Sequence, residues 1–149
     1  MGGPIIKFSS LHEAYECMRE WQNRLFLKDW FIKVAFASPY EMGDDMKRSI
    51  LGQACEDTMD KTCLIRIVDT HDGHEDDLVK PCDELTMVHE LLHCKLERAD
   101  YAPDNTEGRA YKQAEHVLVE ELARAFVMAK YGIDNDWFRH FQYPRAMAG

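Results

Sequence analysis

The stretch from Asp83 to Glu97 reads DELTMVHELLHCKLE and places two histidines, His89 and His93, four residues apart. Apolar residues recur in it at helical spacing, at positions 85, 88, 92 and 96. The run therefore predicts a helix over 83–97, with Asp83 as its N-cap and one buried face. Residues four apart differ by only about 40° around a helix axis, so the two imidazoles point the same way.

Two imidazoles on one helix face can hold a single metal ion, and Glu90 lies at the flank of that face. From there its carboxylate can reach a water on the ion without entering the coordination sphere, which is the position of a general base. The pattern predicts a catalytic Zn²⁺ site with His89 and His93 as ligands and Glu90 as the base. Such a site needs three protein ligands and one open position, so a third ligand must lie elsewhere.

A second helix, predicted over 107–131, supplies two adjacent carboxylates for the third ligand, Glu120 and Glu121. No further histidine follows the first motif at the spacing of the extended zinc motif. The face around Glu121 is the more apolar, which favours its burial. Glu120 has the small Ala123 beside it and His116 one turn before it, which leaves room for the close approach of another helix. These grounds favour Glu120 and leave Glu121 as the alternative.

The rest of the chain predicts an α+β domain over 1–149 with a small mixed or antiparallel sheet of about three strands. A capping box at Ser10 and Glu13 begins a helix expected over 10–28. Residues 49–57 fit a strand or a short helix, with strand preferred. The other expected elements are strands over 30–37 and 62–68, a hairpin turn at 59–61, loops at 40–47 and 99–106, and a terminal helix over 134–141.

Composition limits the classes of partner and compartment. The 149 residues carry a net charge of -9, which disfavours general binding to nucleic acid. No signal peptide or membrane-spanning run is recognised, so a cytoplasmic protein without membrane attachment is expected. The five cysteines contain no Cys-x-x-Cys pair, which indicates reduced and mostly buried thiols. The acidic stretch 69–77, with His71 and His74, is interpreted as a solvated loop in preference to a cation site.

The two helices resemble the ImmA/IrrE-type metallopeptidases, small bacterial and phage proteins on the glutamate-zincin scaffold. The resemblance covers about residues 60–130. Thr86 stands three residues before His89, as in the family pattern Thr-x-x-His-Glu-x-x-His. The second family pattern, Glu-x-x-Ala-Asn-x-Phe-Ala, matches at Glu120, Ala123 and Phe126, whereas positions 124 and 127 differ. The resemblance selects Glu120 as the third ligand and implies a zincin-like domain.

The expected function is that of a zinc metallopeptidase, in which zinc-bound water activated by Glu90 hydrolyses a peptide bond. The resemblance implies a specific protein as the substrate. His116 is the first choice for stabilising the oxyanion, ahead of Tyr111, Tyr131 and His140, and the segment 64–68 is expected to be an edge strand that pairs with the peptide.

Two alternatives remain for the function and the ligands. SprT-like zincins share the first motif but use a third histidine, for which His116 is the available residue. The competing function is a zinc-containing regulatory or protein-binding module with little or no turnover.

Overall fold

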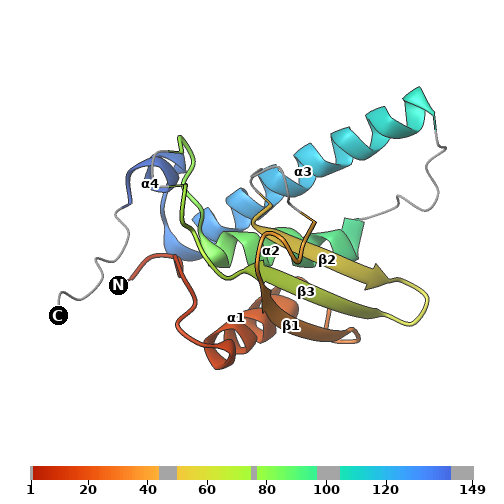
Figure 1. Cartoon of the computed structure of the whole chain (residues 1–149), viewed down its shortest axis with the longest axis horizontal. Helices are drawn as coiled ribbons and strands as arrows, with labels where there is room; N and C mark the ends of the chain where they lie inside the picture. The colour runs from red at the N-terminus through yellow and green to blue at the C-terminus, as the bar shows by residue number, and fades with distance from the viewer. Residues whose placement is uncertain (1, 44–49, 75–76, 97–104, 142–149) are drawn as a thin grey trace.

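The computed structural model describes residues 2–43, 50–74, 77–96 and 105–141 (Figure 1). These residues form an α+β fold with a three-stranded mixed sheet. In chain order the elements are α1 (Leu11–Arg24), β1 (Phe31–Ala37), β2 (Gly52–Asp57), β3 (Thr62–Val68), α2 (Asp83–Leu96), α3 (Thr106–Tyr131) and α4 (Asn135–His140). Parts of the loops predicted at 40–47 and 99–106 lie outside the described residues.

β3 lies in the centre of the sheet, parallel to β1 and antiparallel to β2. Its side chains alternate between the core and the other face, with Cys63, Ile65 and Ile67 buried. The predicted hairpin turn between β2 and β3 is confirmed. The prediction that residues 64–68 form an edge strand is wrong, because β3 has a pairing partner on each side. The strands at the two edges of this sheet are β1 and β2.

α1 begins at the predicted capping box, where the backbone N–H of Glu13 donates to Oγ of Ser10 at 3.1 Å. The helix ends at Arg24, before the predicted residue 28, because Phe26 adopts a left-handed φ of 58° that turns the chain. Trp21, on the inner face of α1, is 2% exposed and belongs to the main core.

α2 is the central element of the fold, since it packs against β2, β3, α1 and α3 (Figure 1). Its residues Met87, Val88 and Leu91 are fully buried. On the opposite side, α3 contributes the buried row Val119, Ala123 and Val127, spaced at four residues. Gly132 ends α3 in the left-handed conformation.

The first turn of α2 carries two buried carboxylates. Asp83 is not the N-cap but the first residue of the helix. Its carboxylate accepts a hydrogen bond from the N–H of Phe8 at 2.8 Å and lies 2.8 Å from Nε2 of His71. Glu84 accepts from four donors, namely the N–H of Ile5, the indole of Trp21, the ammonium of Lys130 and the hydroxyl of Tyr131.

Two further expectations concern the thiols and the membrane. All five cysteines are free, and four of them are buried, as predicted, whereas Cys55 is exposed. Within the described ranges, no helix combines the length and the apolar character needed to cross a bilayer.

Candidate metal centre

α2 presents His89 and His93 on successive turns with Glu90 beside them, as the spacing predicts. The ring centroids of the two histidines are 5.0 Å apart. The His89 side chain is only 12% exposed. Because α2 packs against α1, α3, β2 and β3, the positions of these side chains are fixed by the core of the fold.

His116 of α3 completes a cluster of three imidazoles. Its ring centroid lies 5.0 Å from that of His89 and 5.9 Å from that of His93. One ligand atom from each histidine lies within 4.8 Å of the other two. In the described part of the chain, this is the group of three histidine, cysteine or acidic side chains that converges closely enough to hold a metal ion.

Glu120, one turn after His116, faces His89. Its Oε2 accepts a hydrogen bond from Nδ1 of His89 at 2.6 Å, and Nη2 of Arg124 lies 3.6 Å from its Oε1. The hydrogen bond to His89 lowers the pKa of Glu120, with help from the charge of Arg124, so the carboxylate stays ionised. Burial is the largest single influence on the pKa of His89 and lowers it, but the hydrogen bond to Glu120 and the charges of Glu90 and Glu120 together outweigh burial, so the pKa is raised.

The structure thus brings together all five residues predicted for the site, in an unexpected grouping. His116, predicted as the oxyanion residue, joins the two motif histidines, and Glu120, predicted as the third ligand, contacts the ring of one of them. A carboxylate on the far nitrogen of a metal-binding imidazole is a common way to orient that ligand. The geometry therefore favours His116 over Glu120 as the third ligand, with Glu120 as the residue that orients His89.

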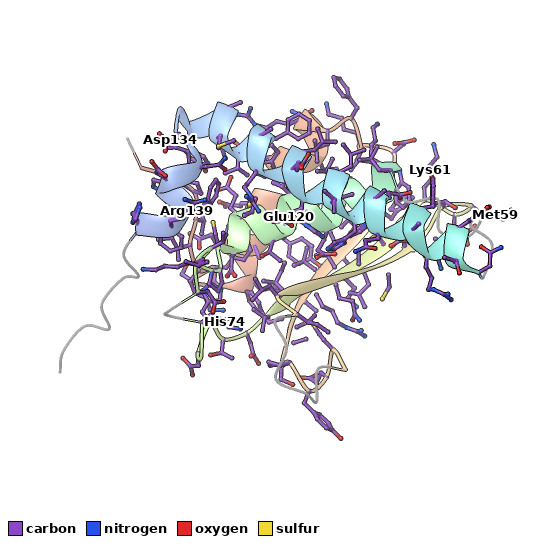
Figure 2. The ribbon with its side chains drawn as sticks, turned by 90° about the horizontal axis from the view of Figure 1, so that it is seen from above. Met59, Lys61, His74, Glu120, Asp134 and Arg139 are labelled. Atoms are coloured by element: carbon purple, nitrogen blue, oxygen red, sulfur yellow. The ribbon has the colours of Figure 1, made fainter. Side chains whose placement is uncertain are left out.

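Glu121 lies outside this cluster, although the sequence indicated that its face would be buried. It is exposed, as are its neighbours Leu118 and Ala125 on the same face of α3. Figure 2 shows α3 crossing over α2, with Glu120 labelled where the two helices cross. Of the two adjacent glutamates, Glu120 is therefore the one at the site.

Glu90 is the most enclosed of the five side chains, with 6% of its surface exposed. Burial raises its pKa from the ordinary value of 4.5 to about 7, and the charges of Glu56 and Glu120 act in the same direction against that of His89. A carboxyl group with such a pKa can take up and release a proton near neutrality.

A cleft of about 510 Å³ opens over the cluster. One wall is formed by β2, through Gly52, Ala54 and Glu56, and another by the segment 79–82. The three histidines, Glu90 and Glu120 all line this space, so a ligand in the cleft reaches them.

Sequence reasoning missed two residues around the site, Gly52 and Arg124. Gly52 lies against Glu90, and its signal was a glycine inside a weak strand pattern, which often marks a close approach of the backbone. Arg124 was noted only as a departure from the family pattern. The signal for its contact with Glu120 was their spacing of four residues on one helix, which is that of a helical ion pair.

The acidic stretch with His71 and His74 lies apart from this cluster. His71 contacts Asp83, and Nδ1 of His74 lies 2.7 Å from Oδ2 of Asp77. The two histidines therefore have separate carboxylate partners.

The comparisons with known proteins give no relative on which to base a function. No protein-family model, curated protein or solved structure shows significant similarity to the chain. The function is therefore argued from the site alone.

Proposed function

We propose that the protein is a zinc-dependent peptidase with His89, His93 and His116 as ligands and Glu90 as general base. The observation that carries this proposal is the convergence of three imidazoles beside a buried carboxyl group at the wall of an open cleft. A structural zinc site generally has four protein ligands, whereas three ligands leave a position for a reacting group.

The donor set fits zinc. Three imidazole nitrogens presented by two packed helices are borderline-soft ligands of the kind found in catalytic zinc sites. When bound, the ion would polarise the substrate carbonyl and lower the pKa of a water molecule towards about 7.

The side chains of the chain itself would supply the remaining steps. Glu90 would accept a proton from the attacking water and deliver it to the leaving amine nitrogen, which its pKa of about 7 suits at neutral pH. Glu120 would hold the His89 ring through Nδ1, which leaves Nε2 as the ligand atom.

The proposed substrate is an extended segment of a protein. β2 lines the cleft and lies at the edge of the three-stranded sheet, so a peptide can lie along it and make main-chain hydrogen bonds. This assigns to β2 the role that the sequence assigned to residues 64–68.

A zincin-like architecture is part of the proposal. A small sheet, a motif helix packed against it and a second helix that brings the third ligand are the parts expected of such a domain. With His116 as a ligand, the site is more similar to the three-histidine pattern of SprT-like zincins than to the glutamate pattern of the ImmA/IrrE type.

Metal analysis of purified variants tests the ligand set. We expect about one zinc per wild-type chain, loss of zinc in His116→Ala, and binding weakened about 10–100-fold in Glu120→Gln, which keeps the shape of the side chain. Wild-type affinity in His116→Ala, together with loss of zinc in Glu120→Gln, would instead make Glu120 the ligand. A zinc-free wild-type protein in zinc-containing buffer would refute the proposal.

Cleavage of fluorescein-labelled casein, an unfolded protein, tests turnover. Glu90→Gln should keep its zinc and lose about 10²–10⁴-fold in rate, since it lacks the base. Glu121→Gln removes the same charge from the exposed neighbour of Glu120 and serves as the matched control, expected at the wild-type rate. Zinc binding without casein cleavage by the wild type would favour the regulatory module.

A further inference from the structure

β2 passes directly over Glu90 at Gly52. A Cβ atom on residue 52 would lie 2.5 Å from Cγ2 of Thr86, 3.0 Å from Oε2 of Glu90 and 3.2 Å from Cγ of Glu90. The φ angle of Gly52 lies outside the left-handed region, so an alanine is conformationally allowed there. A side chain at residue 52 is therefore excluded by the lack of space and not by the backbone conformation.

The carboxyl group of Glu90 is positioned by packing. Among the residues that the structure describes, none donates a hydrogen bond to it, although Glu90 is 6% exposed. Its location therefore depends on the surfaces around it, and the backbone of β2 at Gly52 is one of them. A group fixed by packing alone shifts when a neighbouring surface gains an atom.

We propose that Gly52 is a positioning residue for the general base: the missing side chain lets Glu90 lie against β2, at the distance from the histidines that catalysis requires. The inference rests on the proposed function, because it assigns a partner to the base of that reaction. In the same way, the glycine brings the edge strand to which the peptide would bind close to the base. One residue would then set the spacing between the base and the substrate.

Two substitutions separate positioning from packing. In Gly52→Ala the new methyl group meets both Thr86 and Glu90. In Gly52→Ala combined with Thr86→Ser, the Cγ2 atom of residue 86 is removed, so the closest clash is relieved while the contacts with Glu90 remain. Thr86→Ser alone completes the double-mutant cycle.

The measured quantity is the affinity of the Co²⁺-loaded protein for acetohydroxamate. Binding is monitored through the change in the visible absorption of the Co²⁺ ion. The experiment can be done without knowing the natural substrate. The polar groups of this small chelator can form a hydrogen bond with a carboxyl group beside the ion. We expect the affinity of the Co²⁺ protein for acetohydroxamate to fall about tenfold or more in Gly52→Ala and in the double variant, the size of one lost charge-assisted hydrogen bond. Glu90→Gln shows how much acetohydroxamate affinity is lost when the carboxylate itself is removed. The affinity for Co²⁺ should stay within about twofold of wild type in all of these variants.

The outcomes distinguish the two proposals. If the double variant regains both its melting temperature and wild-type affinity for acetohydroxamate, Gly52 only makes room for Thr86, and the inference is overturned. If the double variant regains its melting temperature and still binds the chelator weakly, the inference is supported. A wild-type protein that binds no Co²⁺ would refute the metal site itself, whatever the role of Gly52.

Discussion

Replacing Glu90 by glutamine should stabilise the metal-free protein at alkaline pH. Burial raises the pKa of Glu90 to about 7 in the folded chain, from 4.5 when the side chain is free. This difference corresponds to about 3 kcal/mol at about 1.36 kcal/mol per pKa unit. The raised pKa contributes stability that is fully present below pH 4.5 and is lost as the pH rises through about 7, because the folded state must then hold a buried charge.

The assay is urea unfolding in EDTA, followed by tryptophan fluorescence, at pH 4.5 and 8.5. Glutamine resembles the protonated acid in shape and cannot ionise. Glu90→Gln should therefore match the wild type at pH 4.5 and exceed its free energy of unfolding by about 3 kcal/mol at pH 8.5. Glu121→Gln, which removes the same charge from an exposed position, should show no such pH-dependent gain. An equal difference between Glu90→Gln and wild type at both pH values would refute the reasoning.

Three further outcomes follow from the packing. Glu84→Gln should lower the free energy of unfolding by about 1–3 kcal/mol at pH 7, because Lys130 loses its buried partner and keeps only the more exposed Glu20. Burial raises the pKa of Glu84, but its hydrogen bonds outweigh burial and lower it. The deficit should therefore shrink as the pH falls below 4.5 in urea titrations, and a constant deficit would contradict this account. Gly132→Ala should cost about 1–2 kcal/mol in thermal unfolding, since φ is 66° there, and an unchanged melting curve would argue against the left-handed cap. Iodoacetamide should add one label per native chain, at Cys55, and additional rapid labels in the mass spectrum would show that the other thiols are accessible.

The sheet shows what a sequence pattern can and cannot predict. β3 was predicted with its observed bounds, Thr62–Val68, because β-branched and apolar residues make up most of it. β2 (Gly52–Asp57) contains no β-branched residue, and it forms because it pairs with β3 and packs against α2. Which strand is central depends on these long-range pairings, and for this reason the edge position was assigned to the wrong strand.

The site shows the same division between local pattern and tertiary packing. The histidine spacing on α2 is a local property of a helix and was predicted correctly. The roles of His116 and Glu120 depend on the rotation of α3 about its own axis, and α3 has apolar residues on two sides. The row that contains Val119 and Ala123 turned inward, whereas the side that contains Leu118 and Glu121 faces solvent. A helical wheel alone does not distinguish these two orientations.

The four donors around Glu84 have a consequence for the synthesis of the protein. Ile5 and Trp21 leave the ribosome early, whereas Lys130 and Tyr131 are among the last residues of the described fold to emerge. Until they do, two of the four hydrogen bonds to Glu84 cannot form. Burying this carboxylate in the core is unfavourable before all its donors are present. His116 also emerges only after the whole of α2. A nascent chain therefore cannot bring His89, His93 and His116 together until α3 has been synthesised.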